Sequence, residues 1–343
     1  MSTTFEYDGT RIKVVGHGHT GHRDSARGAG VGLLMPPRGL FVGLTTLDLV
    51  QRVAQRPGVN EKVVARRSDL AAGGPAAAAA VTFSALGGHS VLLSALGPGP
   101  VARLAAGDLD RVGVQVVDAW AAGADLSISA ITVLEGTGQR SVVSRNAEDS
   151  TAVVPADLPT LTRDADVVLI DGHHPPVAVA AARAARAAGV PVVLDCGSPK
   201  PVYAELVPLA DAVVCSASFL PGRLDRCDAD GFDADCFYPI AAALLASGAR
   251  IVAVTAGAAP VRWQTGEATG AVEIPSVIVH DTLGAGDALH GAVAFARARG
   301  VTDPERSLSF GVAVAALRVQ HVGPRAWLND QRLVAVSAET FGD

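Results

Sequence analysis

From residue 40 onward, fully apolar runs of strand length alternate with amphipathic stretches of helix length. LFVGL and SVLLSAL frame a predicted helix over 73–88, and later DVVLIDG precedes PVAVAAARAARAAG, VPVVLDCG precedes KPVYAELVPLA, and RIVAVTAG closes the series. Strands that are apolar on both sides need a cover on both faces, which intervening helices provide when the strands run parallel. The alternation therefore predicts an α/β fold, built on a parallel sheet with helices on both faces.

Two segments, residues 45–70 and 127–145, depart from this alternation. Polar and apolar residues alternate in them as they do in antiparallel strands, and the second contains a Glu-Gly-Thr-Gly turn. We expect these segments to form a small β lid that projects from the α/β body. Because the open edges of such a sheet need covering, we also expect a homodimer that forms through the lid.

The composition is that of a packed protein, with 49% hydrophobic and 18% charged residues. A net charge of -6 argues against nucleic acid or an anionic membrane as a general partner. The sequence shows no signal peptide and no apolar run long enough to span a bilayer. The four cysteines have no zinc spacing, and we expect free thiols in a cytoplasmic protein: Cys196, Cys215, Cys227 and Cys236.

The first 38 residues differ from the rest, since they are rich in Gly, His and Arg and have little apolar periodicity. They contain a formal GxGxxG at Gly16, Gly18 and Gly21, but no helix pattern follows it, as a dinucleotide site requires. We interpret residues 1–38 as a flexible extension, of which 1–34 are dispensable, and residues 39–335 as one catalytic domain.

The stretch DTLGAGDALHG, residues 281–291, places a carboxylate directly after two glycines where an apolar helix begins. A helix N-terminus presents unsatisfied N–H groups and a partial positive charge, and glycines let an anion approach the backbone closely. Asp287 would then stand beside a phosphate site, placed to take a proton from an attacking hydroxyl. The alternative is that Asp287 only favours the helix dipole and the glycines only form a turn.

Two motifs resemble signatures of the PfkB carbohydrate kinases, which have the ribokinase-like fold. DTLGAGDALHGAVAFA is similar to the C-terminal signature, and GGPAAAAAVTFSALGG with ALGPGPVARLAAGDLDRVGV is similar to the N-terminal one. The resemblance runs from about Phe41 to Trp327. It is closest to the sulfofructose kinase and ketohexokinase branches, through the Gly-Gly-Pro-Ala-Ala run, GAGDALHGA and VAALRVQHVGPRAW.

The resemblance implies a set of roles for a kinase that uses ATP and Mg²⁺. Asp287 would be the general base, and the N–H groups of the preceding residues would form an anion hole for the transferred phosphate. The implied anion-hole residues are Gly284, Ala285 and Gly286, the sugar-binding residues Asp48, Gly73 and Gly74, and the nucleotide-binding residues Thr255, Gly257 and Thr282.

Several positions leave alternatives open. Asp48 is either a sugar-binding residue or a turn residue or solvated charge, and Gly73 and Gly74 either contact the sugar or only begin a helix. Arg140 is either a solvated residue of a sheet edge or a lid residue that binds an anionic or polyhydroxy substrate. Many members of the family carry Asn-x-x-Glu after the strand that matches DAVVCS, whereas this chain has Ser216 and Phe219 at those places. The metal ligands are therefore not assigned from the sequence.

The leading functional prediction is an ATP-dependent sugar kinase that phosphorylates a hydroxymethyl group, such as the C1 hydroxyl of a ketose. A nucleoside kinase of the same fold is the second reading, although the lid segments contain no aromatic residue to stack a base. A catalytically weak protein that binds or regulates is the third, because Ser216 and Phe219 replace the usual motif.

Overall fold

The computed structural model describes residues 4–7, 12–15, 35–148, 150–219 and 234–342. The chain divides into two compact units, Met1–Pro36 and Pro37–Asp343. In the first unit, β1 (Thr4–Tyr7) and β2 (Ile12–Val15) pair as antiparallel strands. The GxGxxG glycines lie outside the described residues, and the dispensable extension stays a prediction.

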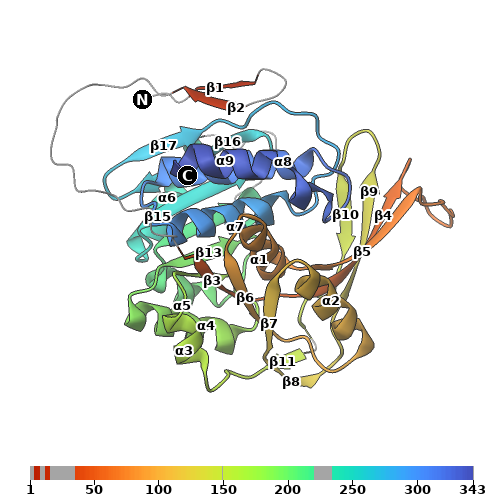
Figure 1. Cartoon of the computed structure of the whole chain (residues 1–343), viewed down its shortest axis with the longest axis horizontal. Helices are drawn as coiled ribbons and strands as arrows, with labels where there is room; N and C mark the ends of the chain where they lie inside the picture. Colours follow the sequence, from red (N-terminus) through yellow and green to blue (C-terminus); the bar gives the residue numbers. More distant parts are fainter. Residues whose placement is uncertain (1–3, 8–11, 16–34, 149, 220–233, 343) are drawn as a thin grey trace. The chain divides into compact units, whose positions relative to one another are not determined.

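The second unit is built on one nine-stranded sheet, in the order β17-β16-β15-β14-β13-β12-β3-β6-β7 (Figure 1). Seven strands are parallel: β3 (Arg38–Val42), β6 (His89–Ser94), β7 (Val114–Asp118), β12 (Val167–Ile170), β13 (Val192–Cys196), β14 (Ala212–Ser216) and β15 (Ile251–Ala256). These confirm the predicted parallel sheet. Two further strands, β16 (Ala259–Thr265) and β17 (Thr269–Val272), extend the sheet in the antiparallel sense, and the sequence pattern had not indicated them.

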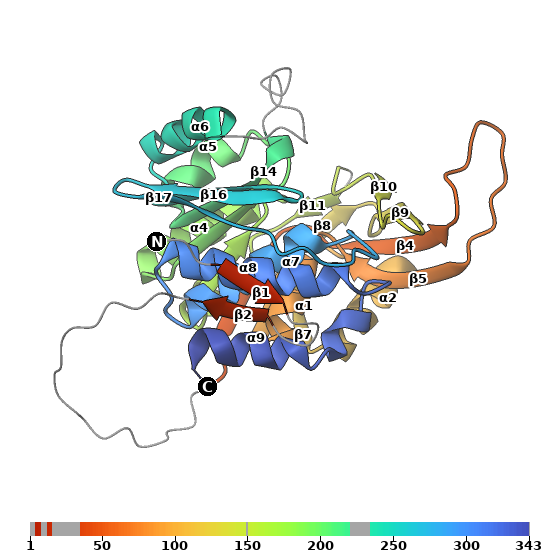
Figure 2. The same cartoon turned by 90° about the horizontal axis from the view of Figure 1, so that it is seen from above.

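Helices cover both faces of the sheet, as the apolar strands require. One face carries α1 (Pro75–Ala85), α7 (Ala285–Ala298) and α8 (Pro304–Val319), which also pack against each other. Figure 2 shows α7 and α8 on one side of β16 and β17, with α6 (Ala234–Ala246) on the other. The remaining helices are α2 (Pro100–Arg111), α3 (Leu158–Arg163), α4 (Pro175–Ala188), α5 (Tyr203–Leu206) and α9 (Arg332–Phe341). None of the helices within the described part of the chain is long and apolar enough to cross a membrane.

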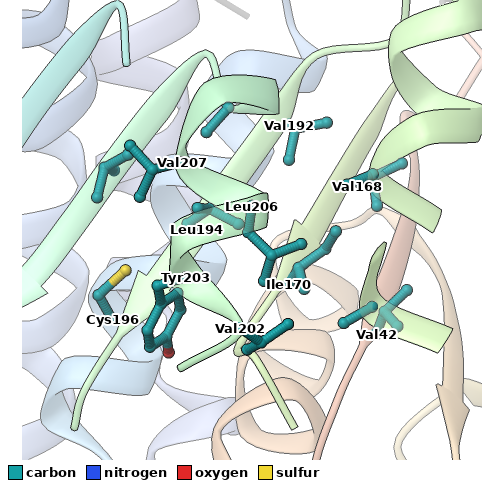
Figure 3. Close-up of a cluster of buried hydrophobic side chains, with 14 of the residues drawn as sticks. Val42, Val168, Ile170, Val192, Leu194, Cys196, Val202, Tyr203, Leu206 and Val207 are labelled. Carbon is teal, nitrogen blue, oxygen red and sulfur yellow. The ribbon is translucent and has the colours of Figure 1, made fainter. Parts of the chain in front are cut away.

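The core gathers valine, isoleucine and leucine side chains from neighbouring strands, and β-branched side chains suit a pleated surface. Figure 3 shows Val168, Ile170 and Leu194 beneath the segment that carries Leu206 and Tyr203. The predicted free thiols are confirmed for the two cysteines in this core, Cys196 and Cys215. The prediction is wrong for Cys236, which is disulfide-bonded, whereas Cys227 lies outside the described residues.

The predicted β lid is confirmed as a separate four-stranded sheet, in the order β10-β9-β4-β5. It consists of β4 (Thr46–Val53), β5 (Arg67–Gly73), β9 (Ile128–Leu134) and β10 (Arg140–Val143). Figure 2 shows β4 and β5 running away from the α/β body. A further short pair joins β8 (Trp120–Gly123) to β11 (Ser150–Ala152).

Candidate active site

The topology of the large sheet decides where a site can form. The chain enters at β3, continues to β6 on one side, and later returns to β12 on the other side. In an open α/β sheet, ligands bind beyond the carboxyl ends of the strands at such a reversal of strand order. The loops that follow β3 and β12 meet at this point.

Asp171, directly after β12, ties these loops together. Its carboxylate accepts hydrogen bonds from the Leu44 N–H at 2.9 Å and from the Ala76 N–H, at the start of α1, at 3.1 Å. The residue is 1% exposed. Burial alone would raise the pKa of Asp171, but His173 and the backbone donors hold it well below its usual range. Asp171 thus anchors the start of α1 as a buried anion.

One pocket brings together five of the predicted residues: Asp48, Gly73, Gly74, Gly284 and Asp287. The first three come from the base of the lid, and the last two come from the start of α7. A Cβ atom on Gly73 would lie 2.0 Å from Asp48 Oδ2, so that position accepts no side chain. The lid and the GAGD segment therefore form two walls of the same site.

Asp48 is largely buried at the lid wall. Burial raises the pKa of Asp48, while hydrogen bonds from Thr46 and Ser129 and the positive charge of Arg325 oppose that rise. The Thr46 hydroxyl donates to Asp48 Oδ1 at 2.7 Å. The second carboxylate oxygen faces Gly73, and a carboxylate placed in this way can accept hydrogen bonds from hydroxyl groups of a ligand.

The start of α7 has the form predicted for an anion site. Gly284 is the N-cap in a left-handed conformation, with φ of 70°, and no side chain caps the helix. The N–H of Ala285 reaches the Thr282 carbonyl only at 3.4 Å. The first N–H groups of a helix have no acceptor within it and attract negative charge. Gly284, Ala285 and Gly286 can therefore receive an anion, which is what the sequence predicts for them.

Asp287 stands in the first turn of α7. Burial raises the pKa of Asp287 to about 7 and the negative charge of Asp195 adds to the rise, whereas His290 and Arg140 lower it. A carboxylate in this range is suited to accept a proton near neutral pH. The arrangement can bind an anion at the helix terminus and remove a proton from a group beside it.

The lining of this pocket also includes Arg318, Arg325 and Trp327, which lie near the C-terminus and had no predicted role. Arg325 donates from Nη2 to Asp108 Oδ2 at 2.8 Å and also donates to the Ala72 carbonyl. These bonds hold the end of β5 in place. All three lie in VAALRVQHVGPRAW, where an arginine inside an apolar helical stretch was the available signal.

The lid also reaches the site through Arg140 and Thr282. Arg140 donates from Nη1 to the Thr282 carbonyl at 3.1 Å, so its charge lies beside the start of α7. The Thr282 hydroxyl donates to the Gly138 carbonyl of the lid turn at 2.9 Å. It therefore faces the lid in this structure, and its predicted contact with a nucleotide stays a prediction.

Comparison with known proteins agrees with this geometry. The profile of the pfkB family carbohydrate kinases matches residues 39–331. The chain belongs to this family. It is 26% identical to a ribokinase of Arabidopsis thaliana over 307 residues, which are 86% of this chain and 79% of that protein. It is 28% identical to an ATP-dependent ribose-1-phosphate kinase of Halopiger xanaduensis over 311 residues, which are 89% and 99% of the two chains.

The solved structure of Arabidopsis thaliana ribokinase, complexed with ribose and ATP, superposes with a TM-score of 0.70. The identity is 25%, and the match covers 88% of this chain and 98% of that one. These matches confirm the predicted ribokinase-like fold and establish this pfkB protein as an ATP-dependent kinase of the sugar kinase type. The sulfofructose kinase and ketohexokinase branches stay a prediction.

Two of the three residues predicted to bind the nucleotide in this pfkB kinase, Thr255 and Gly257, lie along another part of the sheet edge. Thr255 is the penultimate residue of β15 and pairs with Ser216, and its hydroxyl donates to the Cys215 carbonyl at 3.3 Å. Gly257 follows with φ of 59°. Neither Thr255 nor Gly257 is among the described residues that line the pocket around Asp287.

The place of the Asn-x-x-Glu motif holds hydroxyl groups and an aromatic ring. Ser216 and Ser218 share a hydrogen bond of 2.7 Å between their hydroxyls, and Phe219 packs edge-on against Tyr203 at 5.3 Å. Within the described residues, no group of three or more His, Cys, Asp or Glu side chains is placed to hold a metal ion.

Proposed function

We propose that the protein transfers the γ-phosphate of ATP to a hydroxymethyl group of a sugar, with Asp287 as the general base. The observation that carries this proposal is that Asp287 and the start of α7 line the same pocket as Asp48 and Gly73. A sugar hydroxyl bound there would stand between a proton acceptor and an anion site. Phosphoryl transfer needs little more than this positioning and charge stabilisation.

The steps follow from the residues of the chain. Asp48 accepts hydrogen bonds from sugar hydroxyls, and Gly73 lets the ring approach the lid backbone. Asp287 takes the proton of the attacking hydroxyl as the oxygen–phosphorus bond forms and the bond to ADP breaks. The N–H groups of Gly284 and Gly286 and the charge of Arg140 stabilise the phosphate oxygens during transfer.

Mg²⁺ is the expected metal, because it neutralises the phosphate charge in transfer from ATP. In such sites it is held by one or two carboxylates together with phosphates and water. Asp195 fits that requirement: its buried Oδ2 has no hydrogen-bond partner within the described residues, and the His290 Nδ1 lies 3.4 Å away. We propose Asp195 as the residue that would hold Mg²⁺.

The acceptor is a hydroxymethyl group of a small sugar, either C1 of a ketose or C5 of ribose. The ketose is favoured by the sequence likeness to the ketohexokinase branch, and ribose is favoured by the ribokinase relatives. A nucleoside also presents such a group, but Trp327, an aromatic side chain at the pocket, is only 3% exposed and offers a base little surface to stack on. These acceptors share the reacting hydroxymethyl group and differ in the rest of the molecule, so a panel of acceptors can distinguish them.

The test is ADP release measured with fructose, a ketose sulfonate, ribose, ribose 1-phosphate and a nucleoside, each at the same concentration. The product of the best acceptor is then identified by phosphorus–proton NMR. Phosphorylation of one hydroxymethyl group, abolished in Asp287→Asn, is the expected result. ADP release that no acceptor stimulates would contradict the proposal.

We also propose that two copies associate through their lids. The two edge strands of the lid sheet, β5 and β10, have no partner strand in the sheet order of the described residues. Several large apolar side chains are exposed on the lid: Leu70, Ile128, Val142 and Val143. An exposed apolar surface of this kind, beside open sheet edges, is typical of an interface.

A further inference from the structure

The turn that joins β9 to β10 contacts the loop that leads into α7. The Gly138 carbonyl accepts hydrogen bonds from both the N–H and the hydroxyl of Thr282, at 3.1 and 2.9 Å. Arg140 donates to the Thr282 carbonyl at 3.1 Å, and Arg52 of β4 donates to the His280 carbonyl at 3.0 Å. Every polar group of Thr282 is thus bonded to the lid.

The next residue along the loop also packs against the lid. Leu283 contacts an apolar cluster of lid side chains, formed by Val50, Ile131 and Val133. Leu283 immediately precedes Gly284, the N-cap of α7. The lid therefore contacts the loop as far as Leu283, the residue directly before the proposed anion hole.

The residue before Thr282 is anchored on the opposite side, in the α/β body. The Asp281 carboxylate accepts from the Gly323 N–H at 3.1 Å and lies 3.5 Å from the Arg318 guanidinium. It also accepts from the Leu283 N–H at 2.9 Å. Asp281 fixes one side of the loop to the body, and Thr282 fixes the other side to the lid. The path of the loop into α7 consequently depends on where the lid turn lies.

We propose that Gly138 and Thr282 are positioning residues for phosphoryl transfer, through which the seated lid turn holds the anion hole in its working geometry. The proposal rests on the function given above, because it assigns the start of α7 to the transferred phosphate. A sugar that binds against Asp48 on the lid would favour the seated turn. Sugar binding would then complete the phosphate site at Gly284 through the lid.

The lid turn offers a matched pair of glycines for the test. Gly138 and Gly136 both have positive φ, 66° and 84°, so an alanine is similarly strained at either position. A Cβ atom on Gly138 would lie 2.8 Å from the Asp281 nitrogen, whereas a Cβ atom on Gly136 would meet nothing within 4 Å. Gly138→Ala therefore separates the turn from the loop, and Gly136→Ala controls for the strain alone.

The experiment combines kinetics with amide hydrogen exchange. Loss of one hydrogen bond changes a rate by roughly 3–10-fold, and displacement of the turn removes several contacts. We expect Gly138→Ala to lower kcat by about 10-fold or more, and Gly136→Ala to stay within about 2-fold. Thr282→Val should lower kcat by roughly 3–10-fold, and Thr282→Ser, which keeps the hydroxyl, should restore it.

Exchange of the peptide that covers residues 281–287 is measured on the free proteins, without sugar or ATP. Faster exchange in Gly138→Ala than in Gly136→Ala supports the proposal. Equal exchange in the two variants overturns it, and so does faster exchange with unchanged kcat. If the wild-type protein phosphorylates no sugar, the proposed function fails, and the exchange data still decide whether the lid turn holds this loop.

Discussion

Replacing Asp287 with asparagine should make the protein more stable, because ionising the partly buried native carboxylate costs free energy. Burial is the main cause that raises the pKa of this group from its ordinary value of 3.8 to about 7. At pH values between these two pKa values, the folded chain keeps a proton on Asp287 that the unfolded chain has released. The free energy of unfolding of the wild type therefore falls as the pH rises from about 4 to about 7.

The size of the effect follows from that difference in pKa. One pKa unit corresponds to about 1.4 kcal/mol, so the ionised group costs the fold about 4 kcal/mol above pH 8. The pKa of the folded state already includes the attraction between this negative charge and the start of α7, so nothing further is subtracted. Asp287→Asn should therefore gain about 4 kcal/mol above pH 8. The gain should disappear near pH 4.

The assay is urea unfolding of both proteins at several pH values between 4 and 8.5. Asp303→Asn is the matched control, because Asp303 is an exposed acid at another helix start, where it caps the Glu305 and Arg306 N–H groups. Asparagine caps equally well, so this variant should lose less than about 1 kcal/mol at every pH. If Asp287→Asn were less stable than the wild type at pH 8, the account of a costly buried carboxylate would be wrong.

Three further predictions concern catalysis, assembly and the N-terminal segment. Since Asp287 must be ionised to accept a proton, kcat/KM should fall about tenfold per pH unit below pH 7, and a flat profile from pH 5.5 to 8 would refute this. Sedimentation should show a dimer at micromolar concentration, and Val143→Glu, which places a charge on the exposed lid face, should give a monomer; a monomeric wild type would count against the lid interface. A chain that starts at Met35 should keep its turnover and its Tm, and a loss of several degrees would show that residues 1–34 pack against the rest.

Much of the fold could be predicted because the strands of the central sheet are buried on both faces. Runs such as VVLI and VVLDC have few alternatives to a covered parallel strand. The antiparallel strand β16 was not predicted, although APVRWQT alternates in polarity as the lid segments do and follows β15 after a short turn. Its place in the large sheet depends on pairing with β15, which no local pattern reveals.

The candidate site could be predicted in part, because residues that follow parallel strands gather at one edge of the sheet. That rule applies to Asp171 after β12, whereas Asp48 lies inside lid strand β4 and Asp287 inside the first turn of α7, and their shared site was implied by the family resemblance. The rule could not bring in Arg325, which reaches the pocket from the C-terminal region and bonds to Asp108, a residue 217 positions earlier. It also could not show that the Thr282 hydroxyl turns toward the lid, because side-chain direction in a loop depends on tertiary contacts.

The most direct test of the central claim is kcat of Asp287→Asn on the best sugar, measured together with the affinity for ATP on one preparation. Asparagine keeps the shape of the side chain and the glycines before it, and removes only the proton acceptor. The account predicts a fall in kcat of about 10²–10⁴-fold, with unchanged ATP affinity and a protein that is folded. A variant that keeps the wild-type kcat would show that Asp287 is only a charge at a helix start, and would contradict the account.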